Sequence, residues 1–361
     1  MKQLFLTILV ISSFNTYATD DGFRFSPGRS GCYDLDGEGS SRGYNDGWIQ
    51  RLGGHGECGD FTDNYWHLSG AHLRNANFVG AKLIRKSFVR SNIGGAKFLH
   101  ANLIGAVFSE IRDRRVVTAI YTNDDSNVAR VWFAGANLAT AKLFESDLEK
   151  TNFRNANLMG ADLHGSLFKL VHMENVNFSN ANVEDCDFNM TRLEGANFQN
   201  AKVRGANFAR AKMKRTNFKS LRANDLQMNS AGMQDAIMSF GKLQRINFER
   251  TSMTGMNFYR TICTRCNLKD AYIGEGNMRL ANFSRSNFEG SQLYKVDLRN
   301  ANMSRTKLRG ARLAEADLRG ANFSNSNLKD ALTLLRAKFN NQTKLPFSKT
   351  YALQRGMLYR P

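Results

Sequence analysis

Large apolar residues recur along the chain at every fifth position, a period that fits neither an α-helix nor a flat β-strand. In residues 192–218 they stand at regular intervals of five: Leu193, Phe198, Val203, Phe208, Met213 and Phe218. The same phase begins at Leu68, continues to Phe108, resumes at Phe133 and holds until Leu328. A fixed short period of this kind indicates a repeat architecture, in which each unit packs only against its neighbours.

The repeated A(N/D/K)(L/F)xx pattern resembles the pentapeptide-repeat family over about residues 68–330. The resemblance implies an all-β fold, a right-handed quadrilateral parallel β-helix in which four pentapeptides form one square coil. The central residue of each pentapeptide, and the small residue two places before it, would then face inward. Stacking of such coils predicts two inward columns of phenylalanine: Phe178, Phe198, Phe218 and Phe258 in one, and Phe168, Phe188, Phe208 and Phe248 in the other.

The N-terminal residues indicate export from the cytoplasm. Residues 1–18 contain Lys2, a short apolar run and small residues ending at Ala18, which is typical of a secretory signal peptide. No later segment has an apolar run long enough to span a membrane. We therefore expect a periplasmic or secreted protein without a transmembrane span. In an oxidising compartment, the Gly-rich and aromatic-rich residues 19–66 are predicted to form an N-terminal cap with a Cys32–Cys58 disulfide.

The pentapeptide-repeat β-helix is predicted for residues 67–330, followed by a C-terminal cap over residues 331–361. Within that cap, Ser348 is a suitable N-cap for a short helix that Gly356 would close. C-terminal helices of the family also dimerise in some members, so the resemblance leaves monomer and dimer open.

The repeat is interrupted between Phe108 and Phe133. Two β-prone stretches flank the polar sequence TNDDSN, which predicts a projecting hairpin loop over residues 109–132. Tyr121 and Trp132 are its candidate contact residues. The alternative is a run of five degenerate pentapeptides, because the gap of 25 residues preserves the phase of the repeat.

Candidate chemistry within the repeat is sparse. Cys263 and Cys266 have the CxxC spacing of redox and metal sites, but both fall on inward positions and are interpreted as core residues. The six histidines lack zinc-ligand spacing. Outward carboxylates have no accompanying base or pocket. We therefore predict no catalytic residues, no metal, no cofactor and no enzyme activity.

Charge provides the strongest functional signal. The chain has 50 Lys and Arg against 32 Asp and Glu, a formal charge of +18. Such an excess favours an anionic partner. Stacking by coils places basic residues in rows on one side, which are the candidate anion-binding residues: Arg245, Arg265, Arg285 and Arg305 in the main row, Arg279, Arg299 and Arg319 beside it, and Arg222 and Lys242 between the rows.

These observations predict a non-enzymatic exported scaffold that binds a polyanion such as lipopolysaccharide phosphate, an anionic lipid or glycan, or nucleic acid. The alternative is a protein-interaction module that uses the 109–132 loop to bind an unidentified protein. The family resemblance also raises topoisomerase protection by mimicry of DNA with an acidic surface. That function is rejected here because the chain is strongly basic and carries an export signal.

Overall fold

The computed structural model describes residues 78–88, 96–108 and 131–361, apart from 145, 147 and 150. The predicted signal peptide, the N-terminal cap with Cys32 and Cys58, and Tyr121 lie outside the described residues. Spatial contacts divide the chain into two compact units, Met1–Asn177 and Phe178–Pro361, and each is described by itself.

In the first unit, parallel β-bridges join residues 20 positions apart. Trp132 pairs with Asn152, and Asn137 pairs with Asn157. This separation matches one coil of four pentapeptides. The inward residues form columns, and in one of them four phenylalanine rings stack at centroid distances of 4.8 to 4.9 Å: Phe78, Phe98, Phe133 and Phe153.

The interruption between Phe108 and Phe133 changes the register of this unit. Lys97 pairs with Trp132, and Asn102 pairs with Asn137, so the partners are 35 residues apart, 15 more than in a regular coil. An uninterrupted run of degenerate pentapeptides would keep the separation at 20. Trp132 also pairs with Asn152, so it belongs to a coil, and its exposed fraction is 38%.

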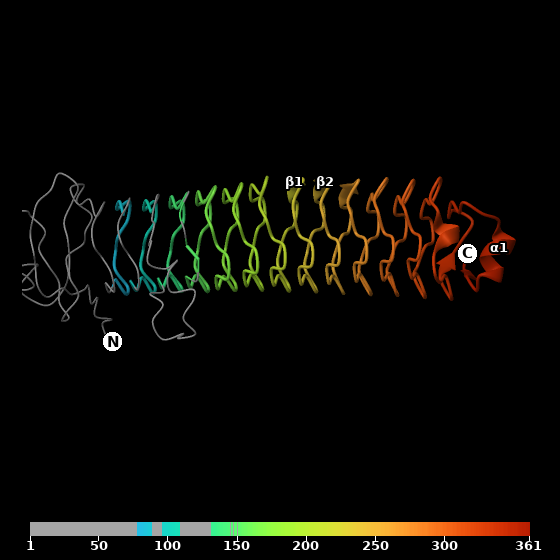
Figure 1. The fold of residues 1–361 in the computed structure, drawn as a ribbon, viewed down its shortest axis with the longest axis horizontal. Helices are drawn as coiled ribbons and strands as arrows, with labels where there is room; N and C mark the ends of the chain where they lie inside the picture. Colours follow the sequence, from blue (N-terminus) through green and yellow to red (C-terminus); the bar gives the residue numbers. More distant parts are fainter. Residues whose placement is uncertain (1–77, 89–95, 109–130, 145, 147, 150) are drawn as a thin grey trace, which may run out of the picture. The chain divides into compact units, whose positions relative to one another are not determined.

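The second unit repeats the same 20-residue pairing on four sides. On one side the strands β1 (Arg222–Asn224), β2 (Lys242–Gln244) and β3 (Ile262–Thr264) form a parallel sheet in the order β1-β2-β3, on successive coils of the stack (Figure 1). Isolated bridges hold the other three sides, such as Asn247↔Asn267, Ser252↔Tyr272 and Asn257↔Asn277. The predicted coil of four pentapeptides is therefore confirmed.

The core of the second unit consists of the inward central residues and the small residues beside them. Phe198 and Phe208 have no exposed surface. Phe178 stacks on Phe198 at 4.6 Å, and Phe188 stacks on Phe208 at 4.9 Å, as the two predicted columns require. Burial of continuous apolar columns at close-packed density stabilises the stack.

The corners of the coil follow from the Asn or Asp that precedes many central residues. Its side-chain oxygen accepts the backbone N–H of the residue two places on, as in Arg279 N–H to Asn277 Oδ1 at 3.1 Å. This local bond favours a turn. The last residue of the pentapeptide then adopts the left-handed conformation, which places outward side chains at the corners.

Coil pairing continues beyond the end of the sequence repeat. The 3-10 helix η4 (Leu328–Asp330) adds one residue, so that Arg312 pairs with Thr333. Strand β4 (Lys338–Phe339) then pairs in parallel with β5 (Leu358–Tyr359). Helix α1 (Lys349–Gln354) lies between these two strands in the chain. Ser348 Oγ accepts a hydrogen bond from the backbone N–H of Tyr351 in the first turn of the helix, and Gly356 follows the helix with a φ of 75°.

Candidate functional site: a basic face on the second unit

The 20-residue coil sorts charge onto opposite sides of the second unit. One side, here called the basic face, comprises residues 219–225, 239–245, 259–265, 279–285 and 299–305, with ten Lys or Arg and one acidic residue, Asp225. The opposite side lies two pentapeptides further along each coil, in residues 229–235, 249–255, 269–275, 289–295 and 309–315. It has five Lys or Arg and six Asp or Glu. The net charge of the chain is therefore not spread evenly around the coil.

The predicted arginine row lies along one corner of the basic face. The backbone N–H of Arg265 donates to the carbonyl of Ser284, and that of Arg285 donates to the carbonyl of Ser304. These bonds join successive coils, so each arginine of the row lies one coil after the previous one. All four arginines are exposed, and their φ values lie between 54° and 63°. The same backbone conformation therefore recurs at each corner of the row.

The row begins with an ion pair. Arg245 donates Nε and Nη2 to the two carboxylate oxygens of Asp225 at 2.7 and 2.6 Å. These hydrogen bonds lower the pKa of Asp225. Arg265, Arg285 and Arg305 have no ion pair with any residue that the structure describes. Three consecutive cations at one coil spacing, about 4.8 Å, therefore have no counter-charge from the part of the chain that the structure describes.

The second predicted row is mostly neutralised by carboxylates. Arg299 binds both oxygens of Asp297 at 2.9 and 2.6 Å, and Arg319 binds those of Asp317 at 3.0 and 2.7 Å. Burial by itself would raise the pKa of Asp297, but the hydrogen bonds from Arg299 outweigh it and lower the pKa. Arg279 has Asn277 at the corresponding place and makes no ion pair among the described residues.

The flat part of the basic face carries the remaining predicted cations. Arg222 in β1 pairs in register with Lys242 in β2, and Lys242 pairs with Ile262 in β3. Both basic side chains are exposed. Among the described residues, the structure thus gives six cations of this face no ion pair, whereas Arg245, Arg299 and Arg319 bind carboxylates of the chain. The six are Arg222, Lys242, Arg265, Arg279, Arg285 and Arg305.

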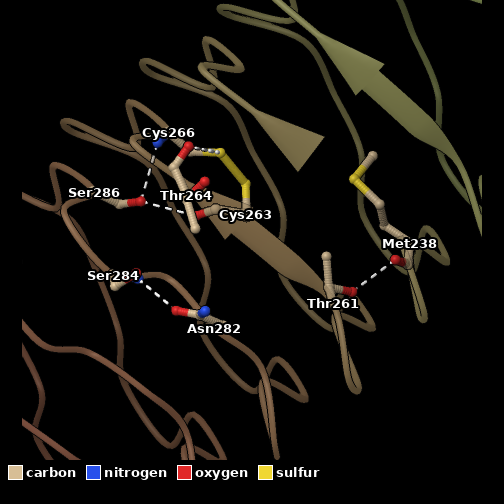
Figure 2. The surroundings of a disulfide bond; sticks show 8 residues. All are labelled: Met238, Thr261, Cys263, Thr264, Cys266, Asn282, Ser284 and Ser286. Carbon is tan, nitrogen blue, oxygen red and sulfur yellow. Dashed lines mark hydrogen bonds between the residues drawn. A yellow bond between two sulfur atoms is a disulfide. The ribbon is translucent and has the colours of Figure 1, made fainter. Parts of the chain in front are cut away.

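A disulfide between Cys263 and Cys266 lies beneath this face, a feature that the sequence analysis did not predict. Both residues are buried, as expected for core positions, and their Cα atoms are 5.8 Å apart. Figure 2 shows Ser286 beside the bridge; its hydroxyl accepts the Cys266 N–H at 3.0 Å and donates to the Cys263 carbonyl at 2.9 Å. Because two inward positions on adjacent sides meet at the corner, the CxxC spacing could have suggested this pairing.

The described part of the chain contains neither a candidate metal site nor a candidate membrane-spanning helix. There, no cluster of three or more His, Cys, Asp or Glu side chains could hold a metal ion. Among the same residues, no helix combines the length and the hydrophobicity that crossing a bilayer requires.

The 20-residue parallel coil defines the class of protein, a β-helical solenoid. Family models for pentapeptide repeats match residues 124–158, 191–222, 261–300 and 301–332, and a second such model matches residues 148–192. The chain belongs to the pentapeptide-repeat family, and its fold is the right-handed β-helix of that family. The matching models describe repeats and name no catalytic domain.

Solved structures of pentapeptide-repeat proteins are similar to this chain. HetL from Nostoc sp. strain PCC 7120, which is involved in heterocyst differentiation regulation, is 21% identical, with 53% of this chain and 87% of HetL covered and a TM-score of 0.34. QnrB1, a plasmid-mediated fluoroquinolone resistance protein, is 14% identical, with coverages of 64% and 91% and a TM-score of 0.27. A protein of the Arabidopsis thaliana thylakoid lumen is 24% identical, with coverages of 40% and 66% and a TM-score of 0.13. A comparison with curated protein sequences found no match.

Proposed function

We propose that the protein is a non-enzymatic exported scaffold whose basic face binds polyanions. The observation that carries this proposal is the run of unpaired arginines at Arg265, Arg285 and Arg305. Like charges at this spacing repel one another unless an anion or salt screens them. The planar guanidinium binds two oxygens of a phosphate or carboxylate at once, so a row of them suits clustered negative charge.

Two features support the proposed export and the proposed kind of ligand. The buried Cys263–Cys266 disulfide favours an oxidising compartment, because thiols remain reduced in the cytoplasm. The uniform arginine row carries charge with little pattern. The proposed ligand is therefore recognised by its charge density, without base or sugar specificity, and binding weakens as salt is added.

Inorganic polyphosphate is a suitable probe for this function. The variant Arg265→Glu, Arg285→Glu should bind it at least tenfold more weakly than the parent at low salt. The matched control is Arg309→Glu, Arg312→Glu, which makes the same charge change at exposed arginines on the opposite side. Equal losses in the two variants would reduce the basic face to bulk charge, and a parent that does not bind polyphosphate would refute the proposal.

A second candidate function is protein binding by the segment between Phe108 and Val131. The register change of 15 residues supports it, because that length of chain is additional to the regular coil. Insertions into a regular scaffold are a common location of binding specificity. Trp132 is half-exposed at the point where the coil resumes, and Tyr121 is the other contact residue of this candidate.

A further inference from the structure

Large apolar side chains are exposed within the basic face, although the binding of an anion by charge does not need them. Phe240, Ile262 and Leu280 have exposed fractions of 43%, 42% and 37%, and the half-buried Tyr259 lies beside them. We call these four residues the apolar cluster. Residues 239–245, 259–265 and 279–285, which contain the cluster, have six Lys or Arg and no acidic residue.

The coil geometry places the members of the apolar cluster on successive coils. The ring centroids of Phe240 and Tyr259 are 5.6 Å apart with an edge-to-face orientation, and the Phe240 N–H donates to the Tyr259 carbonyl at 3.0 Å. Arg260 follows on the next coil and donates its N–H to the carbonyl of Arg279, the residue before Leu280. One corner therefore presents Phe240, Arg260 and Leu280 on three successive coils.

One cation of the chain lies near each aromatic ring of the cluster. The Lys219 ammonium lies 6.0 Å from the centroid of the Phe240 ring, and the Arg260 guanidinium lies 5.4 Å from that of Tyr259. Cation–π contacts of this kind hold charge and apolar surface side by side. The cluster and the cations thus form one surface that is both apolar and strongly positive.

The backbone at two of these positions does not favour a bulky side chain. Phe240 and Leu280 have φ values of 61° and 60°, in the left-handed region where Gly and Asn are preferred. Asn300 occupies the same corner two coils after Arg260, and Ser220 occupies it one coil before Phe240, both also at positive φ. Neither core packing nor local propensity therefore accounts for Phe240 and Leu280.

We infer that the basic face docks on the surface of an anionic lipid bilayer, with the apolar cluster inserted between headgroups. This inference rests on the proposed polyanion binding and specifies the source of the anions. Basic residues near an anionic membrane surface are attracted to it, and exposed Phe and Leu side chains enter the boundary between headgroups and acyl chains. Both kinds of side chain belong to the same side of the coil, in residues 239–245, 259–265 and 279–285.

The same residues are less suited to single-stranded nucleic acid. Binding of that kind uses free aromatic faces on which bases stack. Here Lys219 and Arg260 already lie over the two rings, and Ile262 and Leu280 are aliphatic. The apolar cluster therefore favours a lipid surface over a nucleic acid.

The test compares the full chain on two kinds of vesicle, phosphatidylcholine with about one third phosphatidylglycerol and phosphatidylcholine alone, by cosedimentation. The variant Phe240→Asn, Leu280→Asn should bind the anionic vesicles at least tenfold more weakly, with less than a twofold change on polyphosphate. Asparagine suits both backbones, so the fold is preserved. The matched control, Tyr272→Ser and Tyr294→Ser, removes two exposed rings (58% and 40%) from the opposite side and should change neither affinity.

The outcomes separate the inference from the proposed function. Unchanged vesicle binding by the Phe240→Asn, Leu280→Asn variant would overturn the inference, while loss of polyphosphate binding in the Arg265→Glu, Arg285→Glu variant would still support the function. The inference would also be overturned, in favour of a nucleic acid, if the Phe240→Asn, Leu280→Asn variant lost oligothymidylate binding but kept vesicle binding. As a second measurement, the fluorescence of a Phe240→Trp variant should be quenched by brominated lipids more than that of the parent. Equal quenching would contradict insertion.

Discussion

Replacement of Phe208 by leucine tests whether ring stacking, beyond burial, stabilises the coil. Phe208 is fully buried and contacts three other rings: Phe188 at 4.9 Å, Phe198 at 5.5 Å and Phe218 at 5.9 Å. Leucine already fills the same inward column at Leu268, so it fits the site without a charge or a large cavity. Each aromatic pair contributes about 0.5–1.5 kcal/mol beyond its buried area.

Phe248 provides a matched control within the same column, two coils further along the chain. It is equally buried, but its one ring contact among the described residues is with Phe258 at 6.0 Å. Phe208→Leu therefore removes two more ring pairs than Phe248→Leu. The free energy of unfolding should fall by about 1–3 kcal/mol more for Phe208→Leu, on top of about 1 kcal/mol that both lose in packing.

Denaturant unfolding followed by circular dichroism measures this difference. The slope of the free energy against denaturant should be the same in the parent and both variants, because a changed slope would indicate partial unfolding of the repeat array. Equal losses of stability in Phe208→Leu and Phe248→Leu would contradict a contribution from ring stacking. The stacked rings would then stabilise the coil only through the apolar area that they bury.

Three further predictions concern the loop, the disulfide and an ion pair. Deletion of residues 113–127 should restore the 20-residue register, so the melting temperature should stay within a few degrees of the parent; collapse would show that this segment supports the coil. Replacing Cys263 and Cys266 by alanine should cost about 2 kcal/mol for so short a loop, and mass spectrometry that finds both thiols free would contradict the bridge. Asp297→Asn should cost about 0.5–1 kcal/mol at pH 7, discounted for solvent screening. Because bonds from Arg299 lower the pKa of Asp297, this contribution is present above about pH 4 and is lost as the pH falls through the lowered value; a constant difference down to pH 2 would contradict it.

Counting by five along the sequence is enough to identify the side chains that face the core. A five-residue period fixes the inward positions, so the burial of Phe198 and Phe208 and their columns followed directly from counting. The same counting placed Cys263 and Cys266 inside, and it put the unpaired arginines Arg265 and Arg285 on one corner. The inward positions can be counted in this way because equivalent positions in every coil pack against the same kind of neighbours.

The pairing of coils across the interruption could not be predicted from the repeat. The gap between Phe108 and Phe133 is 25 residues, a multiple of five, so the phase survives whether or not those residues are stacked. The pairing of Lys97 with Trp132 shows which coils meet across the gap, because stacking depends on which strands lie side by side in space. The hairpin over residues 109–132 stays a prediction, since residues 109–130 lie outside the described residues. The added residues near Leu328 likewise end the sequence period while β4 and β5 continue the ladder.

The pairing of charges on the basic face likewise depends on the three-dimensional structure. Asp225, Arg245, Arg265 and Arg285 share a column in the sequence pattern, and the structure shows that the Asp225 carboxylate binds Arg245 through both oxygens. Arg299 reaches back to Asp297 across one corner. Such pairs depend on side-chain rotamers and on the local direction of the backbone, which a period in the sequence does not specify.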